Sequence, residues 1–279
     1  MTRPDGQPRQ LESLAAVESS YDHVYLSPHF DDLALSAGGT VIAQRALGQS
    51  VLVLTVCTAR PPAALTPFAE FQHGAWGGAS DPHAEREAEE RAAMRSLDVD
   101  YLWIDLLDAI YRGEQYLSDA DLFGPVKAGD AGIANRLRGI AEAIATVNPG
   151  AWYYLPLAAG GHVDHRLCSA LEPSLAAYGG RTAWYEDQPY ALDQAAVDEQ
   201  VRLLPAGSRP VIVEFGAMIE RKLDAVRCYA SQIPWIFRES GDASVVLRAH
   251  ATSVSRIAGS AERFWTSDGD GTSFGRLAS

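Results

Sequence analysis

The chain has 279 residues of which 47% are apolar, which indicates a folded protein with a sizeable core and excludes disorder, collagen and coiled coils. Its net charge of -13 would repel a phosphate backbone, so we expect no nucleic-acid partner. No segment reaches the ~20 consecutive apolar residues of a membrane span, and the N-terminus lacks the apolar core of a secretory signal, so we expect a cytoplasmic protein without membrane contact.

Strand-like and helix-like patterns alternate along the chain from residue 23 onward. The predicted strands are 23–27, 51–56, 101–105, 151–157, 181–186 and 210–215. The predicted helices are 33–47, 83–97, about 130–147, 165–178 and 217–231. Two long irregular segments, 57–82 and 106–129, separate these elements, and we expect them to form the rim of a substrate pocket.

This alternation predicts a Rossmann-like α/β fold, with a mainly parallel sheet, helices on both faces and a C-terminal extension. We expect residues 1–20 to be a flexible segment and residues 21–279 to be a single domain. The last fifty residues are polar and give no clear pattern. No G-x-G-x-x-G turn follows the first strand, so a dinucleotide cofactor is disfavoured.

Two clusters of histidine and aspartate follow the first and fourth predicted strands. The first reads His-Phe-Asp-Asp from His29, and the second reads His-Val-Asp-His from His162. In the common doubly wound order these two strands are neighbours, so the clusters would converge where such sheets bind ligands. His29 and Asp32 are three residues apart, and His162 and His165 repeat that spacing, so each pair can point at one spot.

These residue types suit a catalytic divalent ion, since three nitrogen or oxygen ligands and an open water position are typical of catalytic zinc. One histidine would then remain for chemistry. Asp31 could act as general base toward the water, and Asp164 could orient an imidazole. The alternative is that these side chains only cap helices. We expect one zinc ion, although iron or another divalent ion could occupy such a site.

The pattern S-P-H-x-D-D-x-x-L-S-x-G-G, followed by H-x-D-H, resembles the LmbE/PIG-L family of zinc-dependent N-acetylglucosaminyl deacetylases. Two weaker similarities are the Arg86-Glu87-Ala88-Glu89 segment of the helix predicted over 83–97 and the Tyr-Glu-Asp-x-Pro-Tyr run of 185–190. The resemblance covers residues 23–231 and implies a Rossmann-like fold. It also implies removal of an acetyl group from an amino sugar, which releases acetate and a free amine.

The resemblance also implies a role for each motif residue. His29, Asp32 and His165 would bind zinc, and Asp31 would deprotonate the water. His162 would stabilise the oxyanion or protonate the leaving amine, with Asp164 holding its imidazole. The remaining candidates would bind the substrate: Arg86, Glu186, Asp187 and Tyr190.

Those four residues also have ordinary structural explanations. Arg86 could pair with Glu89 or Glu90 on a solvated helix face, and a turn around Pro189 could account for the acidic residues before it.

The sequence departs from the family pattern in three places. Phe30 and Leu33 replace a proline and a glutamate of many members, which would alter a pocket wall. Gly160 stands where some members carry a tyrosine that polarises the carbonyl, so activity would be weak or specialised unless another tyrosine reaches in.

We therefore expect a metal-dependent amide hydrolase that acts on an acetylated amino sugar or glycoside. The alternatives are an amidase of another amide, such as a thiol conjugate, and a sugar-binding module without turnover. The sequence does not predict the oligomeric state.

Overall fold

The computed structural model describes residues 8–17 and 21–267, and among them eight strands form one sheet in the order β1-β4-β3-β2-β5-β6-β8-β7. The strands are β1 (Gln10–Leu11), β2 (His23–Ser27), β3 (Val51–Thr55), β4 (Asp100–Trp103), β5 (Trp152–Pro156), β6 (Arg181–Tyr185), β7 (Arg209–Glu214) and β8 (Ala261–Thr266). Strands β1 to β6 pair in parallel, and β8 is antiparallel to β6 and β7. The predicted mainly parallel α/β fold is confirmed.

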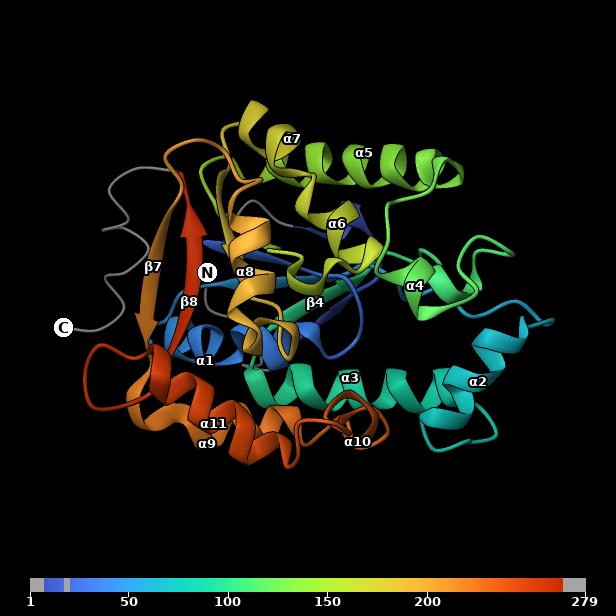
Figure 1. Ribbon diagram of the computed structural model, residues 1–279. Helices are drawn as coiled ribbons and strands as arrows, with labels where there is room; N and C mark the ends of the chain where they lie inside the picture. The colour runs from blue at the N-terminus through green and yellow to red at the C-terminus, as the bar shows by residue number, and fades with distance from the viewer. Residues whose placement is uncertain (1–7, 18–20, 268–279) are drawn as a thin grey trace.

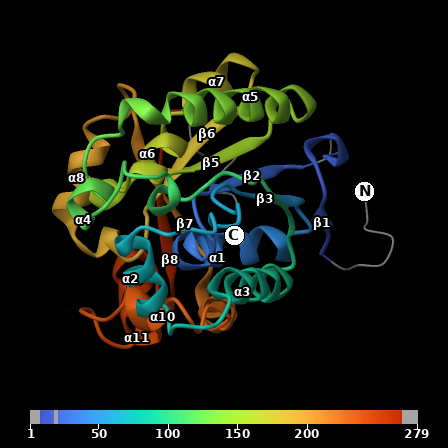
Figure 2. The ribbon, with the colours of Figure 1, turned by 90° about the vertical axis from the view of Figure 1, so that its right-hand side faces the viewer.

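Helices cover both faces of this sheet, with α1, α3 and α9 on one face and α5, α6 and α7 on the other (Figure 1, Figure 2). The α-helices are α1 (Asp32–Ala46), α2 (Pro67–Ala75), α3 (Pro82–Leu97), α4 (Asp119–Leu122), α5 (Ala131–Val147), α6 (Val163–Ser169), α7 (Glu172–Ala177), α8 (Gln194–Val201), α9 (Ile219–Val226), α10 (Ile233–Ile236) and α11 (Ala243–Val254). Short 3-10 helices are η1 (Leu14–Ala16), η2 (Ala109–Tyr111), η3 (Ala128–Asp130), η4 (Ala159–Gly161), η5 (Tyr190–Leu192) and η6 (Gly216–Met218). None of the helices in the described residues is long and apolar enough to cross a membrane.

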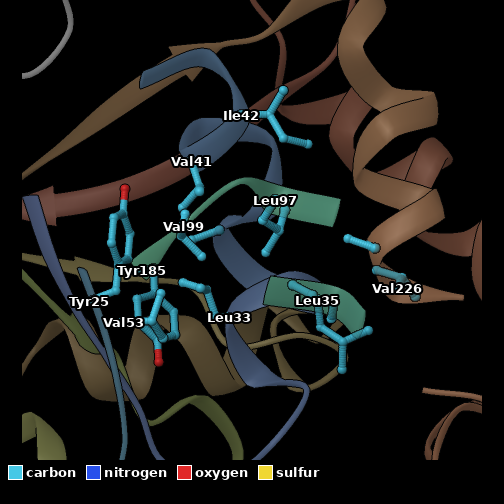
Figure 3. Close-up of a cluster of buried hydrophobic side chains, with 14 of the residues drawn as sticks. Tyr25, Leu33, Leu35, Val41, Ile42, Val53, Leu97, Val99, Tyr185 and Val226 are labelled. Atoms are coloured by element: carbon cyan, nitrogen blue, oxygen red, sulfur yellow. The ribbon is translucent and has the colours of Figure 1, made fainter. Parts of the chain in front are cut away.

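The central strands β2, β3 and β5 are buried along their whole length, as expected for strands covered on both faces. On one face Tyr25 and Val53 of the sheet pack with Leu33 and Val41 of α1 (Figure 3). A second apolar cluster lies on the other face, under α5. The sheet therefore holds the ends of its central strands in fixed positions.

Strand β8 is bound to α1 by a buried carboxylate. Glu262 accepts the backbone N–H groups of Gly39 at 2.9 Å and Thr40 at 2.7 Å, together with Nζ of Lys222 at 2.7 Å. A Cβ atom at Gly39 would lie 2.5 Å from the ring of Phe215, so only glycine permits this close approach. These contacts anchor the helix whose first turn carries the first predicted cluster.

Several predicted segments differ from the structure. The predicted helix over 165–178 is interrupted between α6 and α7, because Pro173 has no N–H and its ring would clash with the preceding turn. The segment 57–82, predicted to be irregular, contains α2, which begins with Pro67 and is capped by Thr66, whose Oγ1 accepts the N–H of Ala69 at 3.2 Å. The predicted helix over 217–231 is shorter and ends with α9 at Val226.

Both ends of the described chain join the sheet. The expectation of a flexible segment over 1–20 is wrong at residues 9–11, because β1 pairs with β4 and the Arg9 backbone N–H donates to Asp100 at 2.9 Å. The parts of that prediction at 1–7 and 18–20 lie outside the described residues. The C-terminal extension supplies α11 and β8, and its last part, 268–279, also lies outside them.

Candidate functional site

The two predicted clusters meet at one edge of the sheet. Strands β2 and β5 pair in parallel, with Val24 opposite Tyr153, so their carboxyl ends lie side by side as predicted. One ring nitrogen from each of His29, His162 and His165 consequently lies within 4.8 Å of the other two.

The donor atoms fit a divalent ion. Oδ2 of Asp32 lies 3.3 Å from Nδ1 of His29 and 3.3 Å from Nε2 of His165. The remaining ring nitrogens face carboxylates, with His29 Nε2 3.0 Å from Asp164 and His165 Nδ1 2.6 Å from Asp187. Outer carboxylates of this kind orient metal-binding imidazoles and leave the inner nitrogen unprotonated.

The electrostatics of this cluster favour positive charge. Burial lowers the pKa of His29, but Asp108 and Asp164 outweigh it and raise that pKa well above its usual value. Burial also opposes protonation of His165, whose pKa Asp32 nevertheless raises to about 10. Carboxylates that stabilise a charged imidazole would equally attract a divalent cation at this point.

Asp31 precedes Asp32 in the chain and lines the same cavity as His29, Asp32 and His165. Burial and the neighbouring Asp32 carboxylate raise the pKa of Asp31 to about 8. Although Asp31 occupies the N-cap position of α1, its side chain makes no capping hydrogen bond. Capping therefore does not account for this carboxylate, and its pKa suits a group that accepts a proton near neutral pH.

His162 does cap α6, as the structural alternative predicted. Its Nδ1 accepts the backbone N–H of Asp164 at 3.2 Å. Burial and the nearby His29 ring lower the pKa of His162 well below its usual value. A neutral ring that accepts at Nδ1 carries its proton on Nε2, so His162 brings a hydrogen-bond donor to the cavity wall.

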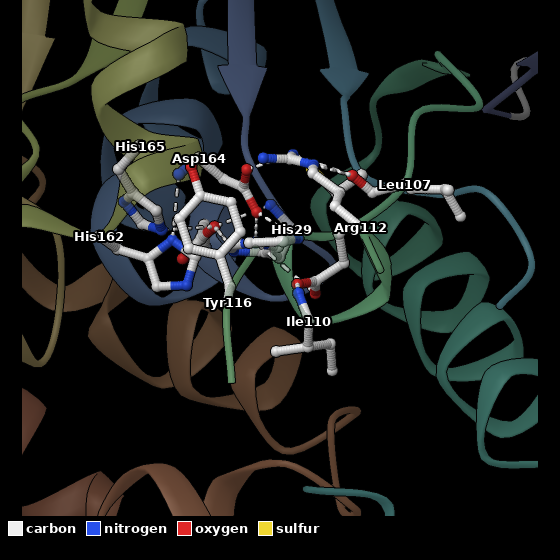
Figure 4. A network of polar contacts seen from close by, with 12 residues as sticks. His29, Leu107, Ile110, Arg112, Tyr116, His162, Asp164 and His165 are labelled. Atoms are coloured by element: carbon white, nitrogen blue, oxygen red, sulfur yellow. Dashed lines mark hydrogen bonds and ion pairs between the residues drawn. The ribbon is translucent and has the colours of Figure 1, made fainter. Parts of the chain in front are cut away.

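Asp164 does not hold the His162 imidazole, and this prediction is wrong. Its carboxylate contacts Nε2 of His29, accepts the N–H of Ala109 at 3.0 Å, and pairs with Arg112 (Figure 4). It therefore orients His29 instead.

Arg112 is a site residue that the sequence did not reveal. It lies in the segment 106–129, where no periodic pattern marks it, and its Nη1 also donates to Asp130 at 3.0 Å. The Asp130 carboxylate in turn accepts the hydroxyl of Tyr116 at 2.6 Å. This buried network holds the Asp164 oxygen that does not contact His29.

Two of the four predicted substrate-binding residues face away from the cavity. Glu186 accepts Nε1–H of Trp265 at 2.9 Å and pairs with Arg263, both on β8. Asp187 is fully buried, where it accepts the N–H of Ala159 at 2.9 Å besides contacting His165. Both are absent from the described residues that line the cavity. Their role as sugar ligands is therefore wrong.

Tyr190, in contrast, lines the cavity beside Gly160. A Cβ atom at Gly160 would lie 2.8 Å from the Tyr190 ring, so this ring occupies the space that a side chain at position 160 would need. The ring also contacts His165 edge-on, with centroids 6.1 Å apart. Burial raises the pKa of Tyr190, so its phenol stays protonated.

Arg86 also lines the cavity and is buried, which excludes the alternative of a solvated helix face. Its guanidinium lies 4.6 Å from the Trp76 ring centroid, and Nη2 lies 3.9 Å from Oδ2 of Asp31.

The cavity has a volume of about 550 Å³. Its floor carries His29, Asp32, His162 and His165. The segments 57–82 and 106–129 contribute to its walls, as predicted, and a third wall comes from residues 232–240. The large aromatic side chains of these walls are Trp76, Phe123 and Trp235. Three of the lining carboxylates are exposed and therefore lie toward the mouth, namely Asp119, Asp193 and Glu239.

Comparisons with known proteins agree with this site. The sequence model "PIG-L: GlcNAc-PI de-N-acetylase" matches residues 24–175. The chain is 32% identical over 221 residues to the 2'-N-acetylparomamine deacetylase of Streptomyces fradiae, which covers 74% of this chain and 72% of that protein.

Solved structures give the same result. The zinc-inhibited form of the teicoplanin deacetylase Orf2 aligns with a TM-score of 0.71 and 26% identity over 87% of this chain and 96% of that one. The A40926 pseudoaglycone deacetylase Dbv21 aligns with a TM-score of 0.68 and 26% identity over 88% and 96%. The chain therefore belongs to the PIG-L family of N-deacetylases.

Proposed function

We propose that this chain removes the acetyl group from an N-acetylated amino sugar within a small-molecule natural product. The observation that carries the proposal is the set of donor atoms on His29, Asp32 and His165. In each of the two histidines, the ring nitrogen that faces away from this set contacts a carboxylate. Relatives named as deacetylases of 2'-N-acetylparomamine and of A40926 pseudoaglycone support the substrate class. A cytoplasmic location remains part of the proposal.

Nδ1 of His29, a carboxylate oxygen of Asp32 and Nε2 of His165 would hold one divalent ion, for which we propose zinc. When bound, such an ion polarises a carbonyl and lowers the pKa of a water molecule. Asp164 and Asp187 keep the two imidazoles in the orientation that presents these nitrogens.

In this proposal Asp31 accepts the proton of the attacking water. Its carboxylate borders the cavity, and its raised pKa makes it a stronger base than an ordinary carboxylate; the proton then passes from Asp31 to the leaving amine. Nε2–H of His162 donates a hydrogen bond to the acetyl oxygen as negative charge develops there. The phenol of Tyr190 is a second donor on the same wall and would compensate for Gly160.

The cavity walls support an amino-sugar substrate. Trp76, Phe123 and Trp235 present ring surfaces on which the apolar faces of sugar rings can pack. The carboxylates near the mouth would attract the ammonium groups of a substrate with several amines.

The test measures free amine and acetate released by the metal-loaded protein from N-acetylated amino sugars and from a thiol-conjugated amide. We expect release from the sugars. We also expect Asp31→Asn to keep its metal while kcat falls by about 100-fold or more. Turnover of the thiol conjugate alone would favour the amidase alternative, and sugar binding without product would favour the binding module. An Asp31→Asn variant as fast as the wild type would exclude Asp31 as the base.

A further inference from the structure

The backbone at Asp31 adopts a conformation that residues with a Cβ atom rarely take. Its φ is +95° and its ψ is -37°. Such a conformation persists only where the surrounding structure holds it, and it is often found at functional sites. The question is therefore which residues hold the Asp31 backbone.

The peptide group between Phe30 and Asp31 is contacted at both ends by helix α3. Nη2 of Arg86 lies 3.5 Å from the carbonyl oxygen of Phe30. The backbone N–H of Asp31 faces the carboxylate of Glu90 and opposes the rise in pKa that burial causes there. Arg86 and Glu90 are four residues apart, so they lie on the same face of the helix. One turn of α3 therefore contacts both polar groups of this peptide, the carbonyl oxygen of Phe30 and the N–H of Asp31.

Glu90 is itself held firmly and takes no other part in the site. Its Oε1 accepts the hydroxyl of Thr55 at 2.8 Å, and its Oε2 accepts the hydroxyl of Tyr229 at 2.6 Å. The side chain is 1% exposed and does not line the cavity. Burial raises the pKa of Glu90 to about 7. A buried carboxylate is costly to retain, and here it links β3 and the segment after α9 to the Asp31 turn.

We propose that Glu90 is a positioning residue which, together with Arg86, fixes the Phe30–Asp31 peptide and thereby aims the Asp31 carboxylate into the cavity. Rotation of this peptide would change φ of Asp31 and swing its side chain. The inference rests on the proposed function, in which Asp31 is the general base.

Glu89 provides a matched control on the same helix. Its carboxylate accepts the N–H of Ser231 at 2.7 Å and the hydroxyl of Ser231 at 2.8 Å. It therefore binds the same segment after α9 as Glu90 does but has no contact with the Asp31 turn. Glu89→Ala removes a comparable tertiary contact without disturbing the peptide.

We expect Glu90→Ala to lower kcat by about 10- to 100-fold, because small displacements of a reacting group cost rate on that scale. Its KM and its bound metal should stay as in the wild type. Glu89→Ala should leave kcat unchanged. Glu90→Gln retains an acceptor oxygen for the Asp31 N–H and should recover most of the lost kcat.

The positioning role is overturned if Glu90→Ala is no slower than Glu89→Ala, if it loses its metal, or if Glu90→Gln is as slow as Glu90→Ala. Should Glu90→Ala not fold, the double variant Thr55→Val with Tyr229→Phe releases Glu90 instead, and an unchanged kcat there also overturns the role. The Asp31→Asn variant separates the two proposals. If Asp31→Asn keeps full turnover, the proposed general base is wrong. If Asp31→Asn is inactive while Glu90→Ala is as fast as the wild type, only the positioning role of Glu90 is rejected.

Discussion

Asp31 and Asp32 are adjacent in the sequence, yet their carboxylates have opposite electrostatic surroundings. Burial acts to raise the pKa of both groups, and for Asp31 the neighbouring Asp32 carboxylate acts in the same direction. For Asp32 the His165 and His29 rings outweigh burial and lower the pKa below its usual range. Two carboxylates whose pKa values are driven apart suit different tasks, which supports Asp32 as the ligand and Asp31 as the base.

Tyr190→Phe tests the proposed second donor at the level of one hydroxyl group. The variant keeps the ring over Gly160 and removes only the phenolic oxygen. We expect kcat to fall by about 100-fold, because losing one oxyanion donor costs a factor of that order, while KM and bound metal stay unchanged. Steady-state kinetics with a large and a small acetylated amino sugar measures both constants.

The control is Tyr178→Phe, since Tyr178 is 45% exposed and distant from the cavity lining. If Tyr190 bound only a remote sugar hydroxyl, KM would rise for the large substrate and kcat for the small one would be unaffected. That result would contradict the assignment.

The sequence motif identified the histidines and aspartates of the cavity floor but not their partners. Spacing alone indicated that His29 and Asp32 point to one spot. It could not show that Asp164 pairs with Arg112 or that Glu186 pairs with Arg263, because these partners come from remote segments without a pattern. Partner choice depends on tertiary packing, which single-sequence patterns do not contain.

At the scale of elements, the strongly periodic strands and helices were predictable and the weak ones were not. Strand β5 reads as a continuous apolar run and was recognised from that property. Strand β8 reads Ala-Glu-Arg-Phe-Trp-Thr, with two charged residues followed by two aromatic ones instead of an alternation, and its antiparallel pairing with β7 has no local signature. Helix α2 was missed because the Pro- and Gly-rich composition around it resembles a loop.

The contact between β2 and β5 includes a buried histidine that makes stability depend on pH. Nδ1 of His23 lies 2.8 Å from the hydroxyl of Tyr154, and burial lowers the pKa of His23 to about 4. Between that value and the ordinary 6.5, the unfolded chain binds more protons, so stability falls as the pH falls. We expect His23 to account for a loss of about 2 kcal/mol between pH 7.5 and pH 5.

Denaturant unfolding at the two pH values, for the wild type and for His23→Gln, measures this loss. The variant should be less stable at pH 7.5, because it lacks the contact with Tyr154, but should lose less stability on acidification. His250, whose pKa burial also lowers to about 4, remains in both proteins and is therefore cancelled by the comparison. An equal loss in both proteins would assign the pH dependence to other groups.

At the scale of the whole molecule, the net charge of -13 and the carboxylates near the cavity mouth both favour the approach of a positively charged substrate. Arg238, which also lines the cavity, lies 3.8 Å from Glu239. A cationic substrate should therefore be drawn toward the cavity, and salt should weaken this attraction. We expect kcat/KM for an acetylated amino sugar with free amines to fall as ionic strength rises.

N-acetylglucosamine, which carries no charge, provides the comparison and should show little dependence on salt. Asp119→Asn should reduce the salt dependence of the cationic substrate without changing the rate for the neutral one. Equal salt dependence for both substrates would mean that the mouth carboxylates do not select charge.

The cavity is assembled from two kinds of structure. Its floor comes from the ends of β2 and β5 and the helices that follow them, whereas its walls come from 57–82, 106–129 and 232–240, which lie outside the sheet. Surface segments of this kind accept insertions and exchanges that a buried strand does not. The walls can therefore change in length and sequence with little effect on the strands and helices that carry His29 and His165.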